Sequence, residues 1–153
     1  MKVLITGATS ALAFQLEKKL GPAFDIVFAD SQELPQFLLS NNRFLKIPKG
    51  SEPSFAHQLL STCLDLEISY LFPLRREEIL SLIEARQLFD EYGIKLMVPP
   101  QRALNSLLMG PKIGELTIVG LEEAPGVDES DTDRGAFWAN GEDKATYRIL
   151  TVD

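Results

Sequence analysis

The sequence predicts an α/β protein with three layers, in which about five mostly parallel strands form a sheet between helices. Two observations support this fold class. Short apolar runs of strand type alternate with helical patterns through the first three-quarters of the chain. The connections between them are short, and Gly, Pro and Ser stand at the breaks. Such alternation is typical of parallel strands joined by right-handed crossovers, with helices on both faces of the sheet.

The chain opens with a strand, a tight turn and an amphipathic helix. Residues 2–5 form an apolar run, and the turn over 6–10 is rich in small residues. Leucine then recurs every fourth residue over 12–20, which places these side chains on one helical face. A second apolar strand over 26–29 ends in Asp30. This order of elements is typical of a Rossmann-like nucleotide-binding unit.

The remaining elements continue the alternation. In order, we expect a turn or short helix over 31–39, a strand over 44–48, a helix beginning at Ser51 or Ser54, a strand over 70–72, a long helix over 75–92, a strand over 94–98 and a short helix over 101–109. Ligands of such sheets bind beyond the carboxyl ends of the strands. The segments expected at that edge are 7–10, 30–31, 48–51, 73–78 and 99–102.

The last quarter of the chain differs in composition from the rest. Residues 115–153 hold ten Asp/Glu and three Lys/Arg, whereas the preceding residues hold twelve of each kind. An acidic loop is predicted over 122–134, because this stretch has few large apolar side chains. We expect strands on both sides of it, with Asn140-Gly141 as a hairpin turn. The sequence therefore predicts a Rossmann-like domain over 1–112 and a small acidic β extension over 113–153.

Composition restricts the classes of partner. A length of 153 residues suits one domain with its own core. The net charge of −7 argues against a nucleic-acid or anionic-membrane surface. Cys63 is the only cysteine, so no intrachain disulfide can form and a cytoplasmic location is expected. No apolar run approaches the roughly 20 residues of a membrane span, and the polar residues over 6–10 argue against a secretory leader.

The first turn departs from the dinucleotide-binding fingerprint, which has three glycines. Only Gly7 is present, and Ser10 and Ala13 stand at the other two positions. Gly7, Thr9 and Ser10 could offer amides and hydroxyls to a phosphate, and Asp30 could hold ribose hydroxyls. The simpler interpretation is that Gly7 permits the turn, Ser10 caps the helix and Asp30 caps the following turn. Both interpretations stay open.

A second candidate cluster follows the strand over 70–72. Arg75 and Arg76 could hold a carboxylate or a phosphate through a bidentate guanidinium, and Glu77 lies in the same turn. The alternative is that Glu77 and Glu78 only complement the dipole of the helix that begins there.

Other reactive residues indicate no site. His57 is the only histidine, so a metal site is not expected. Cys63 lies in an apolar helical pattern and is assigned to the core. The acids over 128–133 lack the glycine and the terminal glutamate of an EF-hand loop, so solvation explains them better.

Three segments of the body carry a family resemblance. Residues 70–82 read as strand, proline, polar turn with glutamate and helix, and residues 93–99 read as the strand that follows. The third segment is the turn Leu108-Met109-Gly110-Pro111-Lys112. Together, residues 1–112 resemble the pre-ATP-grasp domain, the N-terminal Rossmann-like domain of ATP-grasp ligases such as biotin carboxylase and carbamoyl-phosphate synthase.

The resemblance implies roles for a glutamate and for Lys112, and it does not extend to the catalytic module of the family. In related ligases a glutamate in the turn after the 70–72 strand faces the substrate. The last segment is similar to the family's Met-Gly-Asp-Lys turn, with Pro111 in place of the acid, which implies an ATP-phosphate role for Lys112. The acidic stretch after Lys112 matches nothing of the ATP-grasp catalytic module. We therefore expect a module that is not an enzyme on its own, but a substrate-side or interaction subunit beside a separately encoded ATP-grasp partner, and able to form a homodimer.

The first turn is also similar to that of extended short-chain dehydrogenases, which reads Thr-Gly-Ala-Thr-Gly-x-x-Gly. The chain matches it over 6–9 but lacks the Tyr-x-x-x-Lys pair of those enzymes. Two alternatives follow: a nucleotide or small-ligand binding protein that uses the first turn, and a reduced protein that binds NAD(P) without turning it over. Neither ATP nor NAD(P) has a complete motif, so the cofactor is left open.

Overall fold

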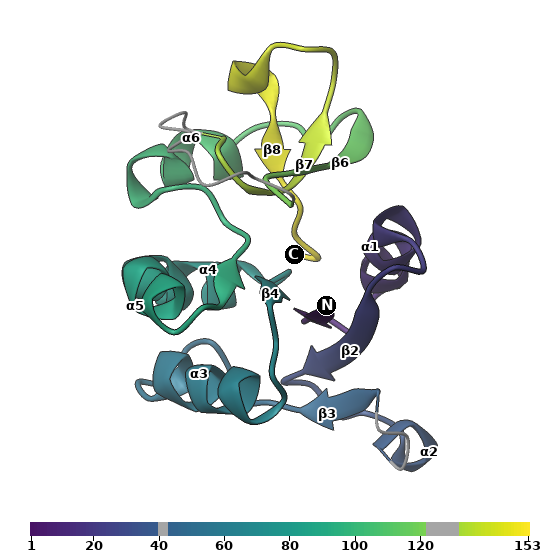
Figure 1. Cartoon of the computed structure of the whole chain (residues 1–153). Coiled ribbons are helices and arrows are strands. Elements are labelled where there is room, and N and C mark those ends of the chain that lie inside the picture. The colour runs from purple at the N-terminus through teal and green to yellow at the C-terminus, as the bar shows by residue number, and fades with distance from the viewer. Residues whose placement is uncertain (40–42, 122–131) are drawn as a thin grey trace. The chain divides into compact units, whose positions relative to one another are not determined.

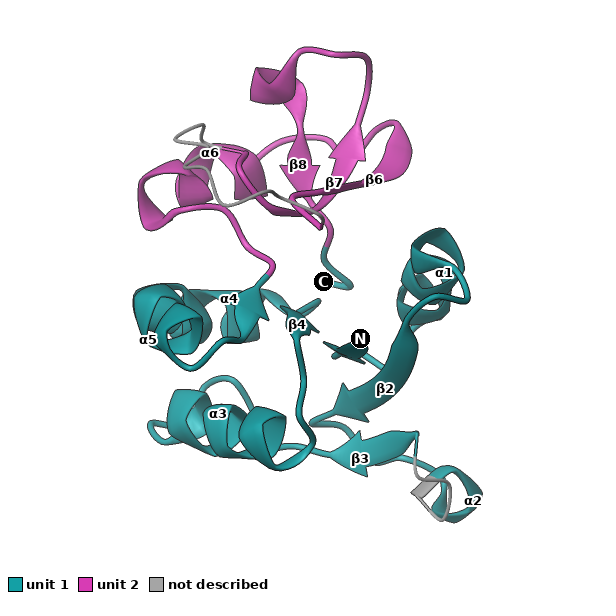
Figure 2. Ribbon diagram, viewed as in Figure 1, with its two compact units in different colours: residues 1–96, 151–153 teal, residues 97–150 magenta. Residues whose placement is uncertain are grey.

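The computed structural model describes residues 1–39, 43–121 and 132–153 (Figure 1). The chain divides into two compact units (Figure 2). Unit 1 comprises Met1–Leu96 together with Thr151–Asp153, and unit 2 comprises Met97–Leu150. This division lies nearer the N-terminus than the boundary at 112/113 that composition and resemblance suggest. Unit 1 is therefore discontinuous in sequence, because its last three residues follow unit 2.

Unit 1 is built on a parallel sheet of five strands in the order β3-β2-β1-β4-β5. The strands are β1 (Lys2–Ile5), β2 (Asp25–Asp30), β3 (Phe44–Lys46), β4 (Tyr70–Phe72) and β5 (Lys95–Leu96). In the register, Ile5 lies opposite Phe28 on one side and Phe72 on the other. This topology confirms the predicted Rossmann-like α/β class. Its strand order reverses at β1 and β4, which is where ligands of doubly wound sheets bind.

Helices cover both faces of this sheet. They are α1 (Ala11–Leu20), α2 (Gln36–Leu39), α3 (Phe55–Asp65), α4 (Arg76–Leu82) and α5 (Arg86–Glu91), with a 3₁₀ turn at Ile83–Ala85. In Figure 1, α1 lies on one side of the strands, and α3, α4 and α5 lie on the other. Right-handed crossovers produce this distribution, because the chain runs outward from β1 to one side first and then to the other.

Helix α1 follows the predicted pattern. Its N-cap is Ser10, whose Oγ accepts a hydrogen bond from the Leu12 amide at 3.1 Å. Gly21 ends the helix with a φ of +83°. Leu16 and Leu20 are buried, so the leucine repeat marks the face that packs on the sheet.

The long helix predicted over 75–92 is interrupted, and this prediction was wrong in that respect. The 3₁₀ turn separates α4 from α5. The backbone departs from helical dihedral angles at Ala85, whose φ and ψ are −96° and +7°. Ile79 before the turn and Phe89 after it are both fully buried.

Unit 2 contains the predicted C-terminal strands. They form an antiparallel sheet in the order β6-β7-β8, with β6 (Glu115–Val119), β7 (Gly135–Ala139) and β8 (Arg148–Ile149). A 3₁₀ turn (Gln101–Ala103), α6 (Leu104–Leu108) and a second 3₁₀ turn (Lys144–Thr146) complete the unit. Most of the acidic loop predicted over 122–134 lies outside the described residues.

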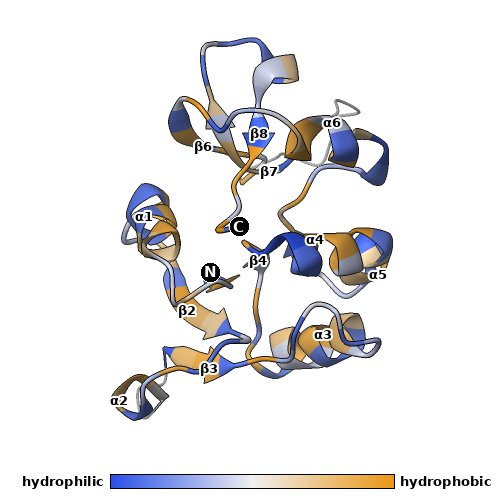
Figure 3. Cartoon of the chain, turned by 180° about the vertical axis from the view of Figure 1, so that it is seen from behind, coloured by the Kyte–Doolittle hydropathy of each residue, from blue (hydrophilic) through white to orange (hydrophobic). Residues whose placement is uncertain are grey.

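Phenylalanines form much of both cores. Phe28, Phe55, Phe72 and Phe89 are fully buried in unit 1, and Phe137 is fully buried in unit 2. Figure 3 shows the contrast between the hydrophobic β2 and β3 strands and the hydrophilic start of α4. Among the helices of the described residues, none combines the length and the apolar character needed to cross a membrane.

Candidate functional site

The candidate site lies in unit 1, at the carboxyl ends of β1, β2 and β4. Three segments meet there: the turn after β1, the end of β2 and the segment between β4 and α4. The sheet order explains their meeting, since β2 and β4 flank β1 on opposite sides. Polar groups of the three segments form hydrogen bonds with one another at this point.

Asp30 is the centre of the network, and its carboxylate is fully buried. Its Oδ1 accepts hydrogen bonds from Arg75 Nε at 3.0 Å and from the Gln32 amide at 3.2 Å. Its Oδ2 accepts from the Thr9 amide at 2.8 Å, from Thr9 Oγ1 at 2.7 Å and from Arg75 Nη2 at 3.0 Å. The carboxylate therefore receives a two-point contact from the guanidinium and fixes the first turn at the same time.

The ionisation of this pair follows from its contacts. Burial acts to raise the pKa of Asp30, but hydrogen bonds from Arg75 and Thr9 outweigh it, so the pKa lies below its ordinary value. Burial acts to lower the pKa of Arg75, and Asp30 more than compensates, so that pKa is raised. Both groups are charged at neutral pH. A buried charged pair of this kind is strongly destabilised when one partner is removed.

The amides of the first turn are also engaged within the chain. The Ala8 amide donates to the Ala29 carbonyl at 3.1 Å, and the Ser10 amide donates to the Gly7 carbonyl at 2.9 Å. The Thr9 amide donates to Asp30, as described above. Gly7 has a φ of +69°, a conformation that glycine adopts without strain. The simpler interpretation of Gly7 and Ser10, a turn residue and a helix cap, describes what these residues do here.

A second buried carboxyl group, that of Glu78, lies beneath this turn. Thr6 Oγ1 donates to Glu78 Oε1 at 2.5 Å and accepts from the Leu74 amide at 2.8 Å. Glu78 is fully buried, and its Oε2 has no hydrogen-bond partner within the described residues. Burial raises the pKa of Glu78 to about 7, although the hydrogen bond from Thr6 and the charge of Arg75 oppose the rise.

Sequence reasoning missed the role of Glu78. The sequence predicts Glu77 as a ligand-binding candidate and assigns Glu78 only a dipole role at the helix start. The signal that separates them is helical spacing: Glu78 stands four residues before the buried Leu82 and next to the buried Ile79. The backbone of Gly50 packs directly against the backbone of Glu78. A Cβ at position 50 would lie only 2.6 Å from the Glu78 amide nitrogen, so glycine permits this close contact.

Residues 151–153 also lie at this edge of unit 1, which the sequence did not predict. The Val152 amide donates to the Leu74 carbonyl at 2.8 Å, and the Arg76 amide donates to Asp153 Oδ1 at 2.9 Å. Val152 Cγ1 lies close to Gly7, at 3.2 Å from the position that a Cβ would take there. The segment thus covers the ends of β1 and β4.

The structure therefore brings together some of the predicted site residues. Thr9, Asp30 and Arg75 are in direct contact. Arg76 uses its backbone amide in the same region, and its side chain is partly exposed, as is that of Glu77. Lys112 is an exposed residue of unit 2, whereas the other candidates belong to unit 1.

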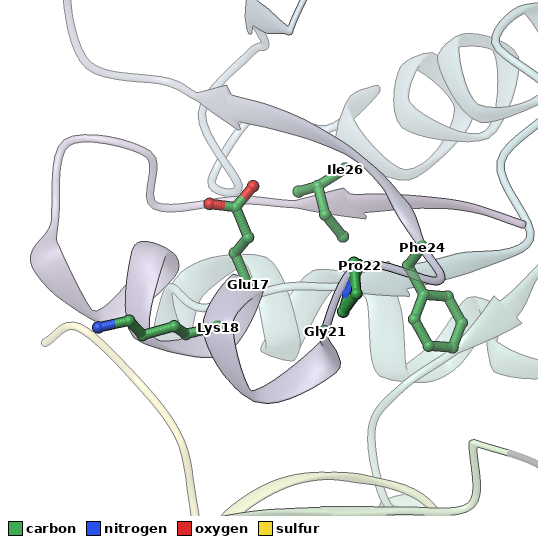
Figure 4. Close-up of a pocket in the computed structure, with 6 residues that line it drawn as sticks. All are labelled: Glu17, Lys18, Gly21, Pro22, Phe24 and Ile26. Atoms are coloured by element: carbon green, nitrogen blue, oxygen red, sulfur yellow. The ribbon is translucent and has the colours of Figure 1, made fainter.

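Two further regions of the described residues, a pocket and a cysteine, lie apart from this network. A pocket at the end of α1 is lined by Glu17, Lys18, Gly21, Pro22, Phe24 and Ile26 (Figure 4). It lies at the amino end of β2, whereas ligands of parallel sheets bind at the carboxyl ends. In the part of the chain that the structure describes, no group of three or more His, Cys, Asp or Glu residues could hold a metal ion. Cys63 is buried, which raises the pKa of its thiol to about 12.

Comparison with known proteins adds no family assignment. No protein-family model matches the chain, and a search of curated proteins finds no match. The resemblance to pre-ATP-grasp domains rests on the residues named above and stays a prediction.

Proposed function

We propose that the chain is a non-catalytic module similar to a pre-ATP-grasp domain, and that it acts as a substrate-side or interaction subunit beside a separately encoded ATP-grasp partner. One observation carries the proposal. At the edge where Rossmann-like proteins bind nucleotides, the Asp30 carboxylate and the amides of residues 8–10 are satisfied by the chain itself.

The physical argument concerns what a nucleotide needs. A ribose needs acceptor oxygens on the acid after the second strand, and a phosphate needs donors in the first turn. To provide these groups, the chain would have to separate Asp30 from Arg75 and Thr9. That separation would leave buried charges unpaired, which is strongly unfavourable. The geometry therefore favours a scaffold over a nucleotide site.

A thermal-shift panel tests this proposal. The protein is melted with ATP, ADP, NAD and NADP at millimolar concentration, with and without magnesium. A ligand present at about 100 times its Kd would add about 2.7 kcal/mol, which is several degrees in Tm. We expect shifts below about one degree for all four nucleotides.

Variants decide what a positive result would mean. A shift that is present in the wild type and in Asp25→Asn, but absent in Asp30→Asn, would overturn the proposal. Asp25 is the matched control, since it is an exposed acid on the same strand. Preference for ATP would then support the nucleotide-binding alternative, and preference for NAD(P) would support the reduced dehydrogenase-like alternative.

The partner is tested separately. Size-exclusion chromatography with light scattering would compare the chain alone with an equimolar mixture of the chain and an ATP-grasp subunit from the same organism. We expect a species whose mass is the sum of the two. Elution of each protein at its own mass, at concentrations of tens of micromolar, would count against an interaction subunit of this kind.

A further inference from the structure

Among the described residues, four strands stand at sheet edges, and β6 differs from the other three. The edges of the parallel sheet are β3 and β5, and those of the antiparallel sheet are β6 and β8 (Figure 1). β3, β5 and β8 have only two or three residues each, and each contains a lysine or an arginine. Short length and basic side chains are features by which edge strands avoid pairing with another chain. β6 has five residues and contains no Lys, Arg or Pro, so it is the edge of this group that best accepts a further strand.

The direction of the free backbone groups of β6 follows from the pairing of its neighbour. The Leu150 amide donates to the Ala136 carbonyl at 3.0 Å, so the backbone groups of Ala136 point toward β8. Backbone groups alternate between the two sides along a strand, so those of Phe137 point toward β6. Phe137 lies opposite Thr117. Thr117 therefore bonds to β7, and the residues on either side of it direct their N–H and C=O groups away from β7.

These two residues, Leu116 and Ile118, are complementary to the same residues of a second copy. If two β6 strands lie antiparallel with a twofold axis at Thr117, Leu116 of each copy lies opposite Ile118 of the other. Both positions have outward backbone groups, so each pair exchanges two hydrogen bonds. Thr117 then faces its own copy, and Thr–Thr is a favourable cross-strand pair. Glu115 lies opposite Val119, so no like charges meet across the axis.

The side chains of β6 and β7 also fit this pairing. Leu116 lies opposite Trp138 and Ile118 lies opposite Ala136, so these four side chains share one face of the sheet. Leu116, Ile118 and Trp138 are partly exposed. In the twofold pairing, Ile118 of one copy lies next to Leu116 of the other, so the row of apolar side chains continues from one copy into the next. Apolar contact between the copies therefore adds to the backbone hydrogen bonds.

We propose that the free edge of β6 is an interface at which two copies of this chain pair antiparallel, about a twofold axis at Thr117. The two sheets of three strands then form one sheet of six. β6 lies beyond residue 112, so this surface belongs to the C-terminal extension and not to the part of the chain that resembles pre-ATP-grasp domains. The proposal does not rest on the proposed function. An edge of five residues gives a small interface, so we expect a reversible dimer.

Sedimentation equilibrium of the purified chain measures this association. In about 150 mM salt, which screens the net charge of −7, we expect the mean mass to rise from one chain toward two between about 1 and about 300 µM. Ile118→Lys places a cation opposite Leu116 of the other copy and should raise the dissociation constant at least tenfold. Leu80→Lys is the matched control, since Leu80 is a 50% exposed leucine on α4 of unit 1. It should dimerise like the wild type.

Single cysteine variants test the register of the two strands. Cys63 is buried and is the chain's only cysteine, so a new cysteine on β6 provides the accessible thiol. Thr117→Cys brings two thiols together at the axis and should form a disulfide-linked dimer under mild oxidation with diamide. Val119→Cys lies on the same face of the strand, but its two copies would stand about 13 Å apart along the strands, which is too far for a disulfide. A mixture of Glu115→Cys and Val119→Cys should crosslink, because these positions face each other.

Three outcomes would overturn the proposal. The first is a mean mass of one chain at all concentrations up to about 300 µM. The second is an Ile118→Lys variant that dimerises as tightly as the wild type, and the third is equal crosslinking of Thr117→Cys and Val119→Cys. If Ile118→Lys fails to fold, the cysteine variants decide, since none of them replaces a buried side chain. The proposed function is decided separately, by nucleotide shifts and by assembly with an ATP-grasp subunit.

Discussion

At the scale of single residues, the pair formed by Asp30 and Arg75 is the main determinant of this site. The Asp30 side chain is fully buried and the Arg75 side chain is 11% exposed. Five hydrogen bonds converge on the two carboxylate oxygens. The pair thus ties the end of β2 to the segment after β4, across the intervening β1. The contribution of the pair to the free energy of unfolding should therefore appear as an interaction energy between the two side chains.

A double-mutant cycle measures that coupling. Asp30→Asn and Arg75→Met should each destabilise the protein by about 3–5 kcal/mol, because each leaves a buried charge without its partner. The double variant should cost clearly less than the sum of the two. Urea denaturation at pH 7 gives the four free energies. Additive losses would show that the two side chains are energetically independent.

Glu78 gives a second prediction at this scale, on pH dependence. Its pKa is about 7 in the folded protein against an ordinary value of 4.5. A carboxyl group with a raised pKa makes the folded state relatively more stable at low pH, and this stability is lost as pH rises from about 4.5 to 7. The loss is on the order of 3 kcal/mol. Glu78→Gln removes the buried charge, so its stability relative to the wild type should increase from pH 5 to pH 8.

Denaturation at these two pH values checks the prediction, with Glu77→Gln as the matched loss of one negative charge in the same turn.

Asp30 changes the pH dependence of stability in the opposite direction. Its lowered pKa contributes stability that is present above its ordinary value of 3.8 and is lost as pH falls through the lower folded value. For Glu78, the contrary result would be a difference in free energy of unfolding between Glu78→Gln and the wild type that is the same at pH 5 and at pH 8. It would show that Glu78 does not change protonation between these pH values.

At the scale of elements, the positions of the helix starts decide the shape of the site. Helix α1 begins at a side-chain cap, whereas the start of α4 is fixed by close packing against Gly50 and by the Thr6–Glu78 hydrogen bond. The two helices should therefore respond to different substitutions.

Gly50→Ala tests the packing of α4. The added methyl group would meet the backbone of Glu77 and Glu78 at 2.6–2.8 Å, so the helix start has to move. We expect a loss of about 1–3 kcal/mol, which is typical of overpacking. Ser10→Ala is the comparison at α1 and should cost about 1 kcal/mol through the lost cap. A Gly50→Ala variant as stable as the wild type would show that α4 is not held by this contact.

At the scale of the whole molecule, net charge governs association. A charge of −7 predicts repulsion from polyanions. In a buffer of about 150 mM salt at pH 7.5, where surface charges act over roughly 8 Å, the protein should pass through a heparin column and be retained on an anion exchanger. Retention on heparin would contradict the expectation that the chain has no nucleic-acid surface.

Local patterns predicted much of the fold but not how its candidate residues are used. The leucine repeat of α1, the cap at Ser10 and the hairpin around Asn140-Gly141 depend on residues near one another in sequence, and the structure contains each of them. The sequence predicts both Asp30 and Arg75 as candidates for binding a ligand. That they bind each other could not be inferred, because the pairing depends on which strands flank β1.

The sequence by itself therefore determined the α/β class, the order of the elements and the acidic character of the last quarter of the chain. Only the tertiary structure decided the strand order, the burial of Glu78 and the return of residues 151–153 to unit 1. The physical reason is one of range. Hydrophobic periodicity and capping act over a few residues, whereas the contacts of Asp30 with Arg75 and of Leu74 with Val152 span tens of residues and exist only once the sheet has formed.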